Sequence, residues 1–194
     1  MEAETKGSME HDIKAFGFWI YLMTDLVLFA ILFAAFVVLR TSTFGGPSAK
    51  ELFHLPFSFA ETIILLTSSF TCSLATFSVF KGKKKWVIFW FAVTAALGIS
   101  FLVLEFSEFN RLINEGNSWR RSAFLSSYFA LVGTHGLHIS IGLLWMFITL
   151  FSIGLRGLRP PDVSRLFRLA YFWHFLDVVW IFIFSIVYAL PRLL

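Results

Sequence analysis

The sequence predicts an all-α integral membrane bundle of five transmembrane helices. The first reason is composition, because 58% of the 194 residues are hydrophobic and only 14% are charged. Charged residues make up about a quarter of an ordinary soluble domain. The second reason is that the chain contains five apolar runs, each near or above the roughly 20 helical residues that cross a bilayer. The third is that these runs are apolar on every side, whereas strands of a membrane barrel alternate polar and apolar residues.

The predicted spans form one domain over residues 16–194. A polar and acidic N-terminal tail, residues 1–15, precedes them, and its composition predicts disorder over residues 1 to about 14. Breaks rich in glycine, proline and charge separate the spans, because such residues end helices. We expect the spans at residues 16–39, 57–80, 86–104, 123–153 and 169–190.

Each boundary has a signal in the chain. The first span ends at Arg40, where "RTSTFGGPSAKELFHLP" contains Gly-Gly-Pro, and the second begins after Pro56 and ends at "KGKKK". The third begins at Trp86, an interfacial anchor, and ends at Glu105. The fourth is longer than a bilayer requires, so it must tilt or protrude. The fifth follows a Pro-Pro pair.

The distribution of basic residues predicts the orientation. The N-terminus and the second and fourth breaks together carry ten Lys and Arg, and the opposite side carries six. The richer side is expected in the cytoplasm, which puts the N-terminus inside and the C-terminus outside. The basic residues lie in short breaks beside apolar runs, which fits anionic lipid headgroups and argues against a nucleic-acid partner.

Ionisable residues inside the spans are the candidate functional residues. A charged group within a bilayer is costly, so each must face protein or trapped water and have a partner. From their depth we expect one polar cluster among the first, fourth and fifth spans. Proton relay, a metal site, a haem site and a purely structural hydrogen-bond cluster are the open interpretations. The members are Asp25, His135, His138, His174 and Asp177.

Three glutamates predict a second polar group on the outer side of the membrane. Glu61 enters its span from that side, Glu105 leaves its span there, and Glu108 lies nearer water. An arginine of the following break can neutralise this group from the interface.

Recognisable catalytic and cofactor motifs are few. Cys72 is the single cysteine, so an internal disulfide and a multi-cysteine metal site are excluded. His135, His138 and His174 have the right chemistry for zinc, yet Asp177 is equally suited to pair with a histidine. We expect no catalytic residue, metal ion or haem in this chain. Two other functions remain open. One is an independent proton transporter that uses Asp25 and Asp177, and the other is a metal-dependent membrane enzyme.

Three stretches carry a family resemblance: "GFWIYLMTDLVLFAILFA" (17–34), "LVGTHGLHISIGLLWM" (131–146) and "FWHFLDVVWIFIF" (172–184). They resemble subunit III of the haem-copper respiratory oxidases over residues 16 to 190. Because the chain has five spans, and Asp25 where the cytochrome c branch has a glutamate, it is most similar to the five-helix form of cytochrome o-type ubiquinol oxidases. A subunit III of a cytochrome c oxidase is the alternative within the family.

The resemblance implies a non-catalytic subunit of a complex in the bacterial inner membrane. Haem b, haem o, copper and ubiquinol are then expected in subunit I, with subunits II and IV as further partners and phospholipid bound. The subunit would support assembly and sustained proton uptake by subunit I. Asp25 matches the family's buried, reagent-sensitive carboxylate, and His174 and Asp177 match positions expected to act as polar fasteners and headgroup supports.

Overall fold

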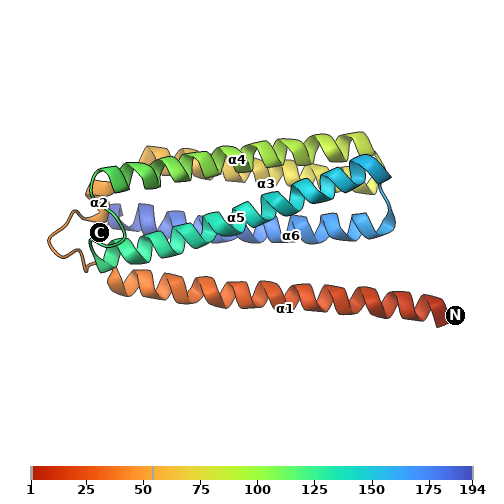
Figure 1. Ribbon diagram of the computed structural model, residues 1–194, viewed down its shortest axis with the longest axis horizontal. Helices are drawn as coiled ribbons and strands as arrows, with labels where there is room; N and C mark the ends of the chain where they lie inside the picture. Colours follow the sequence, from red (N-terminus) through yellow and green to blue (C-terminus); the bar gives the residue numbers. More distant parts are fainter. Residues whose placement is uncertain (1, 54, 194) are drawn as a thin grey trace.

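Five long helices run side by side in the computed structural model, which describes residues 2–53 and 55–193 (Figure 1). They are α1 (Glu2–Leu39), α3 (Leu55–Phe80), α4 (Lys84–Asn114), α5 (Ala123–Arg156) and α6 (Pro160–Ile183). Three short elements are α2 (Ala49–Leu52), the π-helical segment η1 (Phe184–Ala189) and α7 (Leu190–Leu193). The described residues contain helices and no strand, so the all-α prediction is confirmed.

All five predicted spans are confirmed as helices long and apolar enough to cross a membrane. Three of the helices, α1, α4 and α6, extend nine or more residues beyond the predicted limits. Helix α4 continues past residue 104 to Asn114, because Glu105, Glu108 and Leu112 all lie on its buried face. Helix α6 begins at Pro160 instead of residue 169, since proline suits the first turn of a helix, where no backbone N–H donor is needed.

The N-terminal tail differs from its prediction. We expected residues 1 to about 14 to be disordered, whereas α1 begins at Glu2 and continues without a break into the first span. The apolar candidate span within this helix begins at Ile13. The polar tail is therefore a helical extension of the first span.

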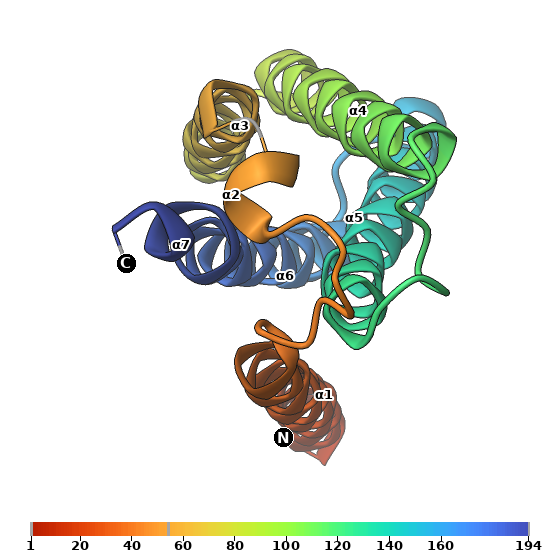
Figure 2. The ribbon, with the colours of Figure 1, turned by 90° about the vertical axis from the view of Figure 1, so that its left-hand side faces the viewer.

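Helix α1 stands apart from the other four long helices (Figure 2). It packs against α5 and α6, while α3 and α4 form a second pair on the far side of α6 and α5. Within the candidate spans, α1 has the smallest buried share, 22%, against 44% for α5 and for the last span. Most of the α1 surface is thus free to face lipid or another protein.

Helix α3 is joined to its neighbours by hydroxyl groups. The indole N–H groups of Trp173 and Trp180 donate to Ser68 Oγ and Thr62 Oγ1, at 3.0 and 3.1 Å. On the other side, the hydroxyl of Thr71 lies 2.8 Å from that of Thr94 on α4. Both indole rings are fully buried, so these bonds satisfy their N–H groups where water cannot.

The ring of Trp173 on α6 reaches α4 at Gly98. A Cβ atom at this position would lie 2.7 Å from the ring of Trp173 and 3.1 Å from Leu143. A small residue leaves space for a bulky side chain of another helix, and such packing is a main source of helix association in a membrane. Gly98 therefore makes room for the buried Trp173 ring.

At one end of the bundle, here called the α2 end, the side chains of two arginines donate hydrogen bonds to backbone carbonyl groups at the C-terminus of α2. Arg111 donates to the carbonyl oxygen of Leu52 at 3.2 Å, and Arg192 donates to that of Phe53 at 2.9 Å. The π-helical segment η1 precedes Arg192, with a bond from the Leu190 N–H to the carbonyl oxygen five residues earlier. The short helix α2 is thus held between α4 and the C-terminal turn.

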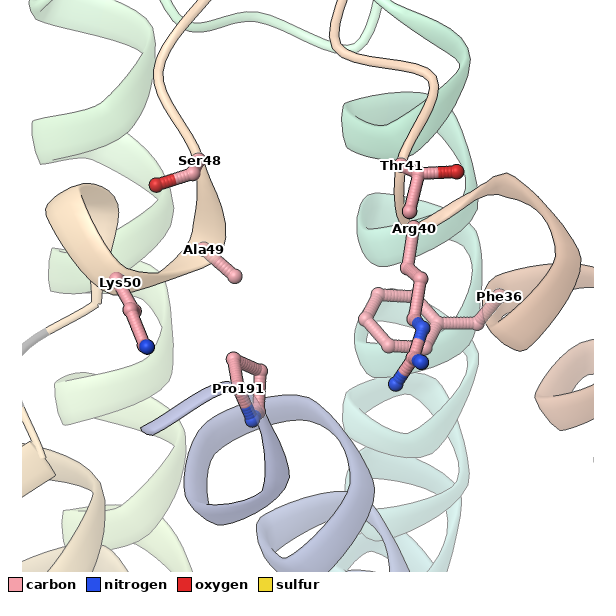
Figure 3. A pocket seen from close by; sticks show the side chains of 7 residues that line it. All are labelled: Phe36, Arg40, Thr41, Ser48, Ala49, Lys50 and Pro191. Carbon is pink, nitrogen blue, oxygen red and sulfur yellow. The ribbon is translucent and has the colours of Figure 1, made fainter. Parts of the chain in front are cut away.

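A pocket of about 270 Å³ opens at the same end between α1, α2 and α7 (Figure 3). Its walls are largely apolar, with Phe36 on one side and Ala49 and Pro191 on the other. The side chains of Arg40 and Lys50 approach it from opposite walls. The pocket therefore combines largely apolar walls with two cationic side chains.

We expect Gly98→Ala to destabilise the folded chain by about 1–3 kcal/mol, because the buried indole of Trp173 cannot move away from the added methyl group. Denaturant unfolding in detergent micelles measures the change. Gly154→Ala is the matched control, since nothing lies within 4 Å of its added methyl group. Equal stabilities of the two variants would contradict a tight contact between Gly98 and the Trp173 ring.

Candidate functional site

Asp25 on α1 lies against His138 on α5. Asp25 Oδ2 and His138 Nε2 are 3.6 Å apart, and both side chains are about nine-tenths buried. His138 Nδ1 lies 2.7 Å from the carbonyl oxygen of Thr134, which can only accept, so this nitrogen carries a hydrogen. One further proton, on Nε2 or on the carboxyl group, is then needed for an attractive contact between His138 and Asp25. The geometry makes this pair a candidate for proton handling.

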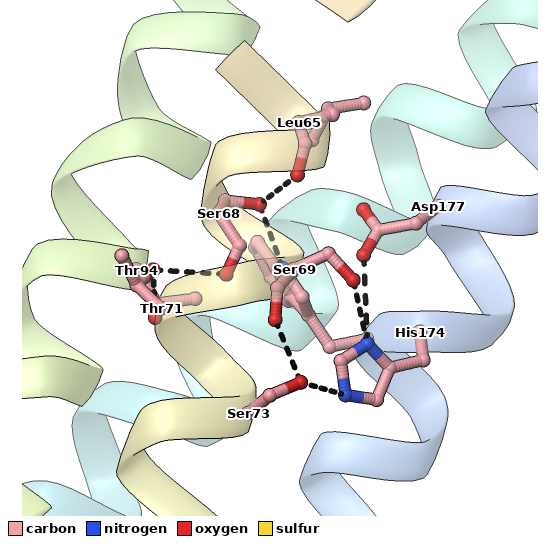
Figure 4. Close-up of polar contacts among 9 residues, drawn as sticks. Leu65, Ser68, Ser69, Thr71, Ser73, Thr94, His174 and Asp177 are labelled. Carbon is pink, nitrogen blue, oxygen red and sulfur yellow. Dashed lines mark hydrogen bonds and ion pairs between the residues drawn. The ribbon is translucent and has the colours of Figure 1, made fainter. Parts of the chain in front are cut away.

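His174 and Asp177 form a separate pair on α6, and they face α3 (Figure 4). His174 Nδ1 lies 2.7 Å from Ser69 Oγ and 3.8 Å from Asp177 Oδ2. His174 Nε2 lies 3.5 Å from Ser73 Oγ. Asp177 is buried behind the ring, while the side chain of His174 is 36% exposed.

His135 lies in a third environment. Its ring is fully buried and packs against Trp180 at 5.2 Å and against the edge of Phe101 at 5.8 Å, measured between ring centroids. Neither ring nitrogen has a hydrogen-bond partner in the part of the chain that the structure describes. His135 thus behaves as an aromatic packing residue in this arrangement.

These contacts differ from the single cluster that depth alone predicts. Asp25 and His138 meet across α1 and α5, as expected, but His174 and Asp177 bond to hydroxyls of α3. No group of three or more His, Cys, Asp or Glu side chains that could hold a metal ion occurs among the described residues. The three span histidines therefore do not come together as a zinc site would require.

The three glutamates gather near the α2 end with two tyrosines. Tyr188 donates to Glu108 Oε2 at 3.1 Å and Tyr128 donates to the same oxygen at 3.4 Å. Arg111 lies 3.5 Å from the other oxygen of Glu108. Glu108 is therefore the best satisfied of the three, with partners from α5, from η1 and from its own helix.

Glu61 and Glu105 have fewer partners than Glu108. Both oxygens of Glu61, a residue only 1% exposed, lack a hydrogen-bond partner among the described residues. Glu61 nevertheless lies close enough to Glu105 and Glu108 to interact with them electrostatically. The carboxyl group of Glu105 rests against Gly136, where an added Cβ would come within 2.6 Å of its oxygen. The outer-side group that the sequence predicts thus does come together in space.

The tyrosines and the serine partners were missed at the sequence level. Tyr128 precedes His135 by seven residues, and two helical turns place both on one face, so spacing could have suggested it. Ser69 and Ser73 are four residues apart on one face of α3. The contact of Tyr188 with this group depends on η1, which has no recognisable signal in the sequence.

Comparison with known proteins identifies similar chains. The model of the family described as cytochrome c oxidase subunit III matches residues 1–191. Subunit 3 of the cytochrome bo(3) ubiquinol oxidase of Pseudomonas aeruginosa is 53% identical over 178 residues, which cover 92% of this chain and 85% of that protein.

Two further relatives come from Bacillus. Cytochrome c oxidase subunit 3 of Bacillus sp. strain PS3 is 42% identical over 187 residues, covering 96% of this chain and 90% of that protein. Quinol oxidase subunit 3 of Bacillus subtilis is 43% identical over 178 residues, covering 92% and 87%. The similarity thus extends over almost the whole chain and includes relatives named for different electron donors.

Replacing Tyr188 with Phe should destabilise the chain by about 1–3 kcal/mol, because it removes the closer tyrosine donor to a buried carboxyl oxygen of Glu108. Denaturant unfolding in detergent micelles reports the difference. Tyr171→Phe makes the same chemical change on an exposed side chain and serves as the control. If both variants unfold together with the parent chain, the tyrosine contact contributes nothing measurable.

Proposed function

This chain belongs to the cytochrome c oxidase subunit III family, and from that membership we propose that it is the non-catalytic subunit III of a proton-pumping quinol oxidase. Such a complex passes electrons from ubiquinol to oxygen in an aerobic respiratory chain. The observation that carries the proposal is the 53% identity to a subunit of a bo(3) ubiquinol oxidase over 92% of this chain. The chain is then an accessory subunit of an oxidoreductase complex.

The partners follow from the same proposal. The complex would contain subunits I, II and IV, with haem b, haem o, copper and the ubiquinol site in subunit I. The redox groups would supply electron transfer and oxygen reduction there, while this chain contributes packing surface and buried polar groups. The weakly buried helix α1 supports this role, because its exposed Trp19, Met23 and Val27 offer an apolar surface to a neighbour.

Phospholipid is a further proposed partner. The pocket between α1, α2 and α7 supports it, because Arg40 and Lys50 approach a largely apolar cavity at one end of the bundle. A lipid phosphate can pair with both cations while its acyl chains follow the apolar helix surfaces. Lipid held there would link the end of α1 to the C-terminal turn.

We also propose a location in a bacterial inner membrane with the N-terminus in the cytoplasm and the C-terminus in the periplasm. The excess of Lys and Arg on the N-terminal side supports this orientation. The α2 end, with the glutamate and tyrosine group, then faces the periplasm. The tail in front of the first span would extend α1 into the cytoplasm.

The proposed supporting role assigns Asp25 and His138 to a site that helps sustain proton uptake by subunit I. Their contact across α1 and α5 supports it, since a carboxyl group and an imidazole that share a proton can exchange it. Subunit III of a cytochrome c oxidase is the second candidate function. It is favoured by the 42% identity to the Bacillus sp. strain PS3 subunit.

Purification of the complex through a tag on this chain tests the proposal. We expect oxidase subunits to copurify and the preparation to consume oxygen with a ubiquinol analogue and not with reduced cytochrome c. Oxygen consumption with cytochrome c would favour the second candidate. Purification of the chain without other oxidase subunits would refute both.

Asp25→Ala should leave initial oxygen consumption largely unchanged, because Asp25 lies against His138 of this same subunit and not at the oxygen-reducing centre. An oxygen electrode on a fresh preparation measures the initial rate, and prolonged turnover then shows whether the activity decays faster. Asp162→Ala, at an ion pair in the first turn of α6, is the control. Immediate total loss in Asp25→Ala alone would mean that this carboxyl group acts directly in turnover.

A further inference from the structure

Helices α3 and α6 present a polar patch on the outside of the bundle, made of Ser69, Ser73 and His174 (Figure 4). Ser73 is exposed, Ser69 is partly exposed, and the His174 side chain is 36% exposed. The Asp25 and His138 side chains, by contrast, are 9% and 11% exposed. The histidine of the His174–Asp177 pair is thus more exposed than the histidine of the Asp25–His138 pair.

The patch lies near the middle of two candidate membrane spans. Ser69 is close to the midpoint of the candidate span Leu55–Phe80, and His174 is close to that of Pro160–Arg192. The neighbouring exposed side chains are Phe70, Phe77 and Val178. An apolar surface therefore surrounds an exposed imidazole at the depth where unsatisfied polar groups cost most.

The ring of His174 has one satisfied and one poorly satisfied nitrogen. The carboxylate of Asp177 and the hydroxyl of Ser69 both lie beside Nδ1, which favours the tautomer with its hydrogen there. Nε2 is then an acceptor, and its neighbour is Ser73 Oγ at 3.5 Å. The Ser73 hydroxyl already donates to the carbonyl oxygen of Ser69 at 3.1 Å. Nε2 thus has only this long contact with Ser73 among the described residues, on a side chain that is 36% exposed.

We propose that this patch is the docking site for a transmembrane helix of another oxidase subunit, whose side chain donates a hydrogen bond to Nε2 of His174. The inference rests on the proposed function, because it needs an oxidase complex. The inference specifies the face of this subunit that contacts a neighbour and the kind of side chain that the neighbour contributes. The donor is a hydroxyl, amide or indole N–H.

Lipid fits this patch poorly. Acyl chains carry no donor, and headgroups lie at the membrane surface, so the headgroup role expected for His174 does not suit a residue in mid-span. The backbone N–H groups of a neighbouring helix are occupied within that helix, so the donor must come from a side chain. A helix that covers the patch also removes Ser73 from contact with hydrocarbon.

Photo-crosslinking in the intact complex tests the proposal directly. A benzophenone side chain replaces Phe77, which is 55% exposed and lies one turn from Ser73 on the same helix. Illumination of membranes should attach this chain to another oxidase subunit, detected as a larger band and identified by mass spectrometry. Adducts with lipid alone would overturn the proposal.

Two substitutions provide an independent measurement in the purified complex. His174→Phe removes the acceptor and should weaken retention of the subunit roughly three- to tenfold, in the range of hydrogen bonds between membrane helices. His174→Gln keeps both a donor for Asp177 and an outward acceptor, and should restore most of the retention. Native gels after a detergent series measure both. Equal retention of the parent, Phe and Gln forms would overturn the docking role.

These outcomes separate the docking inference from the proposed function. If the chain does not copurify with an oxidase, the proposed function fails and the docking site fails with it. If the chain copurifies but Phe77 labels only lipid, the proposed function stands and this inference alone is wrong.

Discussion

The fold depends on one constraint: in hydrocarbon, a polar group must find its partner inside the protein. Helix α3 provides hydroxyl partners for three polar side chains of neighbouring helices. Its hydroxyls accept from both buried indoles of α6 and lie against Thr94 of α4. Because each bond has a fixed position along the helix, the set determines how far α3 can slide or rotate against its neighbours. The helices thus gain a specific register that apolar packing alone would define less sharply.

The same constraint explains where the ionisable groups lie. Paired groups occupy the middle of the spans, and the group with three glutamates lies near the α2 end, where Arg111 reaches it. Aromatic hydroxyls of Tyr128 and Tyr188 complete this group. His135, by contrast, packs against aromatic rings and has no hydrogen-bond partner among the described residues. The bundle therefore combines groups that have internal partners, buried groups that lack one among the described residues, and the partly exposed His174, whose Nε2 has only a long contact with Ser73.

The sequence predicted the number and nature of the spans because hydrophobicity depends on composition and length alone. It also predicted that Asp25 and His138 lie at similar depth in one polar cluster, and these two side chains are in contact. Depth is only one coordinate, however. The rotation of α6 about its axis, which turns His174 toward α3, depends on how bulky rings such as Trp173 fit against Gly98. The end of α4 was misplaced because the predicted span ended at its first charged residue, Glu105. Hydropathy does not show whether such a residue has a partner inside the bundle.

The π-helical segment η1 has a consequence for how this chain tolerates length changes. One residue more than an α-helical turn requires is accommodated between Ser185 and Leu190. Deleting a single residue there would let the segment become regular α-helix while the residues after it keep their direction, because the wide turn absorbs the extra residue. A deletion in the regular part of α6 would instead turn all that follows by about 100°, and Tyr188 and Arg192 would then leave Glu108 and the Phe53 carbonyl together. The wide turn is thus the place where the last span can lose one residue without releasing these two contacts.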